Sequence, residues 1–182
     1  MSTTVGYTTM DSPIGPLLLA STEEGLCFIE FGEEQDSLPS LQRWCKKHFL
    51  GVSVVREDRR NEQAKKQLQE YFSGERSAFD LPLVMYGTPF QKTVWKQLTK
   101  IPYGQTRTYK EIAQAIGTTK AVRAIGGANH RNPIPIVVPC HRVIGTNGAL
   151  VGYSAGLPIK EFLLELEKAS RPQPHSPHSV IR

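Results

Sequence analysis

The chain has 182 residues, of which 39% are hydrophobic and 21% are charged, and its formal net charge is +5. This composition is typical of a globular protein with one large or two small cores, and it excludes a membrane helix because no stretch approaches the roughly 18 continuous apolar residues that one needs. A basic balance of this size favours a polyanionic partner, although many basic proteins bind no nucleic acid.

The first half of the chain alternates apolar and polar residues in the manner of a small sheet. Strands are expected at 4–9, 17–20, 26–31, 52–55 and 79–83. A first helix is predicted over 39–49. A second is predicted over 62–72, where Ala64, Leu68 and Tyr71 share one stripe and Gly74 lies just past the end.

The second half is predicted to be mainly helical. Thr88-Pro89 is typical of a helix start, and apolar residues continue that pattern to Lys100. Thr108 and Glu111 form a capping-box pattern for a helix that Gly117 ends. Thr119 is predicted to cap a helix over 120–129, so that the pair resembles a helix-turn-helix. A final helix is predicted over 157–168, and residues 171–182 are expected to be disordered.

Cys140 has the most reactive setting of the three cysteines. It follows a proline-punctuated extended stretch over 132–139, which we interpret as an apolar strand that its prolines keep out of the middle of a sheet, and it precedes His141 and Arg142. One interpretation is a buried structural cysteine, the usual state of a free thiol. The other is a nucleophile, because positive neighbours favour the thiolate and a Cys-His pair oriented by a carboxylate is a general activation scheme. Cys27 and Cys45 lie far from it in sequence, and no zinc spacing appears.

The helix predicted over 120–129 contains two consecutive glycines, Gly126 and Gly127. Each costs roughly 1 kcal/mol relative to alanine. Close packing against another helix is one explanation. The alternative is a flat face of small residues that lies against nucleic acid, with Arg123 reaching into the duplex. Farther along, the loop 150–157 either lines a pocket for a flat base or is a plain connector.

The segment Pro139-Cys140-His141-Arg142-Val143-Ile144, preceded by Asn132-Pro133-Ile134-Pro135-Ile136, resembles the signature of the O6-alkylguanine-DNA alkyltransferases. The resemblance covers about residues 8–168. It implies a ribonuclease-H-like α/β domain over 1–86 and a winged-helix alkyltransferase domain over 87–170. It also implies direct repair, in which an alkyl group moves once and irreversibly from O6 of guanine, and from O4 of thymine, to Cys140.

The resemblance assigns roles to individual residues. Cys140 matches the acceptor, His141 the base that takes its proton through a water, Glu167 the carboxylate that orients the imidazole, and Asn132 the brace of this network. Tyr109 matches the hydroxyl that protonates or hydrogen-bonds the guanine ring, so that guanine can leave as a neutral base. Four residues match substrate-binding positions: Val143, whose carbonyl recognises the exocyclic amine, Tyr153, Ser154 and Lys160. The DNA-binding residues would be Arg123, which fills the space of the flipped base, and the small residues Ala121, Ala124, Gly126, Gly127 and Ala128.

Two departures from the family pattern affect these expectations. Thr22 and Cys27 occupy the region where some members bind zinc, so we expect no metal and no cofactor. Ala155 stands where many members have glycine, which puts acceptance of bulky alkyl groups in question. The expected partner is double-stranded DNA containing O6-alkylguanine, bound by a cytoplasmic monomer, with cooperative binding as an alternative.

Three rival functions are weighed against this one. A damage sensor of the same family would lack the acceptor cysteine, which is present. A transcriptional regulator would carry an additional cysteine-rich sensor domain, for which the chain is too short. A cysteine hydrolase using Cys140, His141 and Glu167 would turn over on an ester or amide, whereas a single-use reaction would contradict it.

Overall fold

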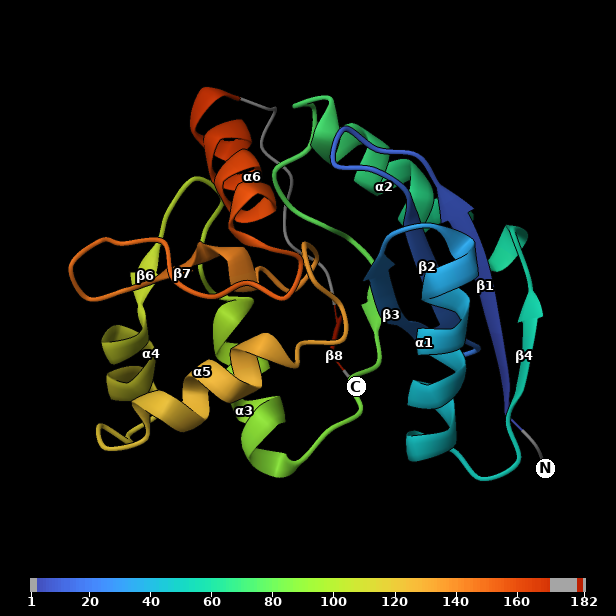
Figure 1. Cartoon of the computed structure of the whole chain (residues 1–182), viewed down its shortest axis with the longest axis horizontal. Coiled ribbons are helices and arrows are strands. Elements are labelled where there is room, and N and C mark those ends of the chain that lie inside the picture. The colour runs from blue at the N-terminus through green and yellow to red at the C-terminus, as the bar shows by residue number, and fades with distance from the viewer. Residues whose placement is uncertain (1–2, 171–179, 182) are drawn as a thin grey trace. The chain divides into compact units, whose positions relative to one another are not determined.

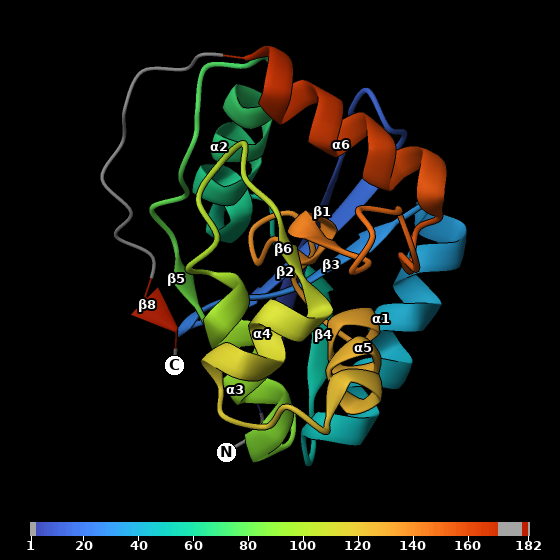
Figure 2. The same cartoon turned by 90° about the vertical axis from the view of Figure 1, so that its left-hand side faces the viewer.

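The computed structural model describes residues 3–170 and 180–181. They form two compact units, which meet along the chain between Tyr86 and Gly87 (Figure 1). The first unit contains the sheet and also includes Val180–Ile181, whereas the second is mainly helical (Figure 2). The predicted combination of an α/β part followed by a helical part is therefore confirmed.

The first unit is built on a six-stranded sheet with the order β4-β1-β2-β3-β5-β8. Its strands are β1 (Thr4–Met10), β2 (Leu17–Thr22), β3 (Gly25–Phe31), β4 (Ser53–Arg56), β5 (Pro82–Leu83) and β8 (Val180–Ile181). The three central strands pair antiparallel, and the other three pairs are parallel. Gly25 has a φ of +153°, and a Cβ there would lie 2.4 Å from the Pro82 carbonyl oxygen, so glycine is required at this crossing.

Helix α1 (Glu34–His48) packs on β2 and β3. Its buried Leu41 and Cys45 join Cys27, Phe28 and other sheet residues in one core cluster. The predicted start of this helix at residue 39 is wrong, because Pro39 lies inside the helix. Glu34 and Asp36 lie in the first turn, where negative side chains suit the helix dipole.

The rest of this unit follows the predicted pattern, except that the strand expected over 79–83 is limited to β5 and that the C-terminus differs. A short 3-10 helix, η1 (Arg59–Asn61), leads into α2 (Glu62–Phe72), which has the bounds predicted from its apolar stripe. The tail was expected to be disordered over 171–182, but Val180–Ile181 form β8 and pair with β5. The remainder of that tail lies outside the described residues.

The second unit is a group of helices with a small parallel strand pair. Its elements are α3 (Pro89–Leu98), β6 (Arg107–Thr108), α4 (Tyr109–Ala115), α5 (Val122–His130), η2 (Cys140–Arg142), β7 (Val143–Ile144) and α6 (Leu157–Ala169). Helices α3, α4 and α5 pack against one another, and β6 pairs with β7. The indole Nε1 of Trp95 donates to the Ala128 carbonyl oxygen at 2.7 Å, which ties α3 to α5.

Capping residues define the starts of two of these helices, α3 and α4. Thr88 and Thr108 form capping boxes with Gln91 and Glu111, as a helix start at each position predicts. Gly117 has a φ of +76° just past α4, which explains why the helix ends there. The predicted cap Thr119 is wrong, since α5 begins after Ala121.

Candidate active site

Cys140 lies at the start of η2 and is only 2% exposed. The strand predicted to lead into it is wrong, because residues 132–139 form turns and bridges instead. In this segment Val138 donates to the Ile134 carbonyl, and Cys140 donates to the Val138 carbonyl. Ile136 has a φ of +74°, a sterically costly conformation for a β-branched residue. The prolines of this segment are incompatible with a mid-sheet strand, and the turns place the thiol inside the unit.

Asn132 holds this turn in place, as its predicted bracing role requires. Its Nδ2 donates to the Val138 carbonyl at 2.7 Å, and its Oδ1 accepts from the Ile134 amide at 3.0 Å. A hydrogen bond from Asn132 also lowers the pKa of the Cys140 thiol, in opposition to burial. One buried side chain therefore contacts both the turn and the sulfur.

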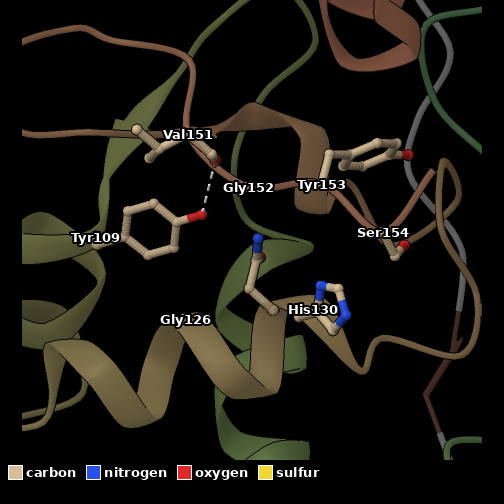
Figure 3. A pocket seen from close by; sticks show the side chains of 8 residues that line it. Tyr109, Gly126, His130, Val151, Gly152, Tyr153 and Ser154 are labelled. Atoms are coloured by element: carbon tan, nitrogen blue, oxygen red, sulfur yellow. Dashed lines mark hydrogen bonds between the residues drawn. The ribbon is translucent and has the colours of Figure 1, made fainter. Parts of the chain in front are cut away.

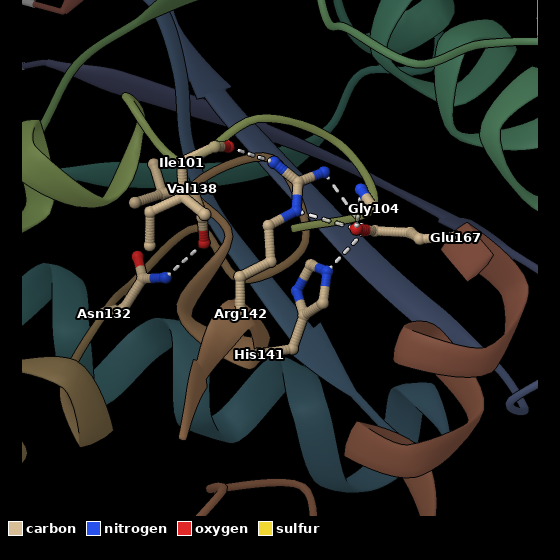
Figure 4. A network of polar contacts seen from close by, with 7 residues as sticks. All are labelled: Ile101, Gly104, Asn132, Val138, His141, Arg142 and Glu167. Carbon is tan, nitrogen blue, oxygen red and sulfur yellow. Dashed lines mark hydrogen bonds and ion pairs between the residues drawn. The ribbon is translucent and has the colours of Figure 1, made fainter. Parts of the chain in front are cut away.

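The Glu167 carboxylate is the centre of a buried polar network (Figure 4). Its Oε2 lies 2.6 Å from His141 Nε2 and accepts from Arg142 Nη2 at 3.0 Å. Its Oε1 accepts from Arg142 Nε at 2.8 Å and from the Gly104 amide at 3.1 Å. Arg142 also donates to the Ile101 carbonyl at 2.7 Å. The structure thus brings His141 and Glu167 together and adds Arg142, to which the sequence analysis gave no role in orienting the carboxylate.

This network determines which nitrogen of His141 is basic. Burial raises the pKa of Glu167, but the hydrogen bonds and charges of His141 and Arg142 outweigh it and hold that pKa well below its usual range. Burial also lowers the pKa of His141, and the positive charges of Arg142 and Lys160 lower it further, against the effect of Glu167. The neutral imidazole therefore directs its Nε2 proton at the carboxylate. Its Nδ1 is buried with no partner among the described residues, as a proton acceptor requires.

The Cys140 thiol is protonated at neutral pH. Burial raises its pKa to about 11, and the hydrogen bond from Asn132 and the charge of Lys160 lower it only in part. Of the positive groups nearby, Lys160 favours the thiolate, but the adjacent imidazole is neutral and Arg142 is paired with Glu167. The proton must therefore leave as the sulfur reacts, which calls for a base nearby.

Lys160 is fully buried on α6 and holds the loop before that helix. Its Nζ donates to the carbonyl oxygens of Val143 at 2.5 Å, Val151 at 2.9 Å and Gly152 at 3.2 Å. Burial lowers its pKa to about 8, so the ammonium form with three donors is present at neutral pH. Neither Lys160 nor Val143 lines the cavity described next, although both were predicted at the substrate.

A cavity of about 210 Å³ lies between α4, α5 and the loop 151–154 (Figure 3). It is lined by Tyr109 of α4, by Gly126, Asn129 and His130 of α5, and by the loop Val151, Gly152, Tyr153 and Ser154. The Tyr109 hydroxyl donates to the Val151 carbonyl at 3.4 Å. The structure thus brings together the predicted Tyr109, Tyr153 and Ser154 around one space.

Cys140 itself does not line the cavity, but two lining residues connect to it. Asn129 Nδ2 donates to the Cys140 carbonyl oxygen at 3.3 Å, and Tyr153 hydrogen-bonds the Cys140 side chain. Asn129 and His130 were missed by the sequence analysis. The signal that finds them is their spacing from Gly126, since positions i, i+3 and i+4 share one face of a helix.

The exposed face of α5 has the small residues that were predicted to approach nucleic acid. Arg123 and Ala124 are exposed, and Ala121 is half-buried. A Cβ at Gly126 would meet nothing within 4 Å, and one at Gly127 would meet Arg131 Nη1 at 3.7 Å. Tight helix packing is therefore not the reason for these glycines. Ala128 differs from the other predicted residues, because it is only 3% exposed and so is not on this exposed face.

No group of three or more His, Cys, Asp or Glu side chains suited to a metal occurs in the part of the chain that the structure describes. Cys27 and Cys45 are buried in the core of the first unit. The absence of zinc stays a prediction. Among the same residues, none of the helices is both long and apolar enough to cross a membrane.

Known protein families account for most of the chain. Residues 5–85 match the ribonuclease-like domain of 6-O-methylguanine DNA methyltransferase, and residues 89–169 match the DNA binding domain of the same family. The chain belongs to the 6-O-methylguanine DNA methyltransferase family. The expected ribonuclease-like first domain is thereby confirmed, and the winged-helix description of the second stays a prediction.

Individual relatives in this family match nearly the whole chain. A methylated-DNA--protein-cysteine methyltransferase of Methanosarcina barkeri is 51% identical over 164 residues, covering 89% of this chain and 96% of the relative. The constitutive methylated-DNA--protein-cysteine methyltransferase of Bacillus subtilis is 46% identical over 167 residues, covering 90% and 96%. The crystal structure of Mycobacterium tuberculosis OGT in complex with DNA has a TM-score of 0.79 and 44% identity, covering 92% of this chain and 95% of that one.

Proposed function

We propose that this chain repairs alkylated DNA by moving a methyl or other alkyl group from O6 of guanine, and from O4 of thymine, to its own Cys140. The observation that carries the proposal is that Cys140 contacts Asn129 and Tyr153, two residues that line a cavity with Tyr109, while the adjacent His141 is paired with Glu167. The relatives named methylated-DNA--protein-cysteine methyltransferases support the same reaction.

The transfer step follows from the protonation states of the site. As Cys140 Sγ attacks the alkyl carbon, its proton passes to His141 Nδ1 through a water, and Glu167 stabilises the imidazolium that forms. The new S–C bond replaces the C–O6 bond, whose electron pair returns to the base. Tyr109 donates a proton to the ring, so that guanine leaves neutral, and recovers one from the imidazolium. The thioether has no good leaving group, so each molecule reacts once.

DNA binding is assigned to α5. The alkylated base is stacked in duplex DNA and must be flipped out to reach a cavity of this kind. The small residues on the exposed face of α5 allow close approach to the minor groove, and Arg123 fills the space that the base leaves. The Mycobacterium tuberculosis relative was crystallised with DNA, which supports this assignment. We propose that the protein acts as a monomer in the cytoplasm, with access to DNA.

Intact mass spectrometry after incubation with a duplex that carries one O6-methylguanine tests the proposal. We expect a gain of about 14 Da, the replacement of hydrogen by methyl, that saturates at one per molecule and maps to the peptide with Cys140. Cys140→Ser is the matched control and should bind the duplex without gaining mass. A lesion that stays tightly bound with no gain in mass would contradict alkyl transfer and indicate a damage sensor.

A further inference from the structure

The positive charge of the chain is concentrated in the second unit. Residues 87–171 contain twelve Lys and Arg against four Asp and Glu, a formal charge of +8, whereas the rest of the chain has a formal charge of −3. Residues 81–160 include a single acidic residue, Glu111, whose carboxylate accepts from the Thr108 amide in the capping box of α4. Helix α5 contributes only Arg123 to this charge, so most of it lies elsewhere in the unit.

Part of this charge lines a groove between α3 and α4. One hollow of about 500 Å³ is bordered by Lys100 and Arg107 together with the amide side chains of Gln97 and Gln114. A second hollow of about 280 Å³ shares Gln97 and Lys100 with the first and adds Lys96. Because they share these residues, the two hollows form one continuous surface, the α3/α4 groove.

The cations of the α3/α4 groove are available to a ligand. Lys96 and Lys100 are exposed, and neither forms an ion pair within the described part of the chain. The guanidinium of Arg107 donates to the Thr106 carbonyl oxygen at 2.8 Å and to the Gln105 side-chain oxygen at 3.0 Å, which are neutral acceptors that leave its charge unbalanced. Three unbalanced positive charges around one groove attract an anion.

The α3/α4 groove and the exposed face of α5 point in different directions. Trp95 is buried on α3, and its indole donates to Ala128 on the buried face of α5. Lys96 lies on the exposed face of α3, and Arg123 lies on the exposed face of α5. Because the two helices pack through their buried faces, these exposed faces point away from each other. A straight duplex that lies along α5 is therefore directed away from the groove.

The lining of the groove favours the backbone of a duplex as its ligand. Sites for single-stranded nucleic acid combine positive charge with aromatic rings on which bases stack, and the described residues that line this groove include no aromatic ring. Lysine, arginine and glutamine side chains instead suit phosphate and sugar oxygens. Exposed Lys92 precedes Lys96 by one turn, about 6 Å along the axis of α3, which is near the roughly 7 Å between every second phosphate of one strand.

We propose that the α3/α4 groove is a second DNA site, which holds the phosphate backbone of a duplex segment other than the one on α5. One chain then contacts two DNA segments at once. Such bridging keeps the protein on DNA while its search for a lesion passes from one segment to another. The inference rests on the DNA binding assigned to α5 and does not depend on alkyl transfer.

A bridging assay tests the second site. Duplex DNA without a lesion is fixed on beads, the protein is added, and the retention of a second, fluorescent duplex is measured beside the amount of protein on the beads. The unmodified protein should retain the fluorescent duplex at about 50 mM salt. In Lys96→Gln/Lys100→Gln the ratio of fluorescent duplex to bound protein should fall at least about tenfold, because two phosphate contacts are lost.

Lys47→Gln/Lys66→Gln is the matched control. It removes the same charge from two exposed positions of the first unit, on α1 and α2, and should keep the ratio of fluorescent duplex to bound protein. Both double variants should unfold in urea at the midpoint of the unmodified protein, since all four side chains are exposed. This comparison separates the groove from net charge and from loss of the fold.

Three results would overturn the inference. One is protein that binds the beads and retains no fluorescent duplex. Another is retention that Lys96→Gln/Lys100→Gln lowers no more than the control does. The third is self-association without DNA, measured by sedimentation velocity, that Lys96→Gln/Lys100→Gln abolishes, because the groove would then bind an acidic surface of a second copy. Beads that bind no protein at all would show instead that the DNA binding assigned to α5 has failed, and this inference would fail with it.

Discussion

Arg142 and His141 compete for the same carboxylate, and their competition sets the state of the base. Arg142 occupies a position on each oxygen of Glu167, and His141 shares one of them. A permanent cation beside a neutral imidazole disfavours protonation of the imidazole. Arg142 is thus a positioning residue whose charge keeps His141 able to accept the thiol proton.

Removing that charge should make repair sensitive to mild acid. In Arg142→Met the pKa of His141 rises, because one of the charges that lower it is gone. The protonated imidazole cannot accept the thiol proton, so activity is lost as pH falls through a higher range than in the unmodified protein. We expect the ratio of the rate at pH 6 to the rate at pH 8 to be about tenfold lower in Arg142→Met than in the unmodified protein. Single-turnover rates across pH 5.5–9 measure this.

Arg142→Lys keeps the charge and loses the paired hydrogen bonds with Glu167. Its acid limb should stay near that of the unmodified protein, even if its absolute rate is lower. An unchanged acid limb in Arg142→Met would show that Arg142 acts through geometry alone.

Helix α5 is less stable than it would be with alanine at position 126. Glycine inside a helix costs about 0.5–1 kcal/mol relative to alanine, and a Cβ at this position meets nothing. Gly126→Ala should therefore raise the free energy of unfolding by about that amount. Gly126 lines the cavity, so the added methyl should also slow the reaction with free O6-benzylguanine. Overpacking of the methyl against the bound base should raise the activation free energy by about 1–3 kcal/mol. Urea unfolding and single-turnover rates measure the two effects.

Gly127→Ala is the matched control, since Gly127 lies on the same helix but does not line the cavity. It should stabilise the protein by a similar amount and leave the reaction with the free base unchanged. Equal slowing in both variants would show that the effect is not a property of the cavity.

Lys160 determines how firmly the loop 145–156 is held. Its ammonium satisfies three main-chain carbonyls, two of them in that loop. In Lys160→Met these carbonyls lose the ammonium donor, at about 1–3 kcal/mol for each buried group that is left unsatisfied. We expect lower stability and faster hydrogen exchange for loop amides, measured by mass spectrometry, with α3 amides as the internal reference. Exchange that rises equally in α3 would indicate global destabilisation only.

The sequence predicts those elements whose signals are local. The bounds of α2 and the capping boxes of α3 and α4 follow from residues within a few positions of each other. The turn before Cys140 does not, because the Asn132 side chain holds it, at the cost of a positive φ at Ile136, in place of the apolar strand that was predicted.

In the candidate site, too, the residues with local signals were predicted and those that depend on distant contacts were not. Cys140 and His141 stand out in the local sequence, whereas Glu167 was named from the resemblance, and the structure places His141 and Glu167 in contact. The role of Arg142 depends on contacts between residues far apart in the chain, such as Arg142 with Ile101. A local pattern contains no information on such contacts, so Arg142 was interpreted only as a positive neighbour of the thiol.

For the molecule as a whole, the net charge of +5 favours binding to a polyanion. Association with duplex DNA releases counterions, so affinity falls as salt rises. We expect the dissociation constant for an undamaged duplex to rise at least about tenfold between 50 and 200 mM salt. Fluorescence anisotropy at several salt concentrations measures the slope, and a flat dependence would contradict binding through the phosphate backbone.

The buried ionisable groups also have a consequence for charge conservation during repair. At neutral pH the carboxylate of Glu167 balances Arg142, Lys160 is cationic, and Cys140 and His141 are uncharged. When the thiol proton moves to His141, the charge is redistributed without changing in total, and the departing guanine takes that proton away as a neutral base. The site therefore has the same net charge before and after the transfer, and no ion has to enter or leave the low-dielectric interior. Once the lesion is bound, the chemical step should proceed at the same rate whatever the ionic strength outside.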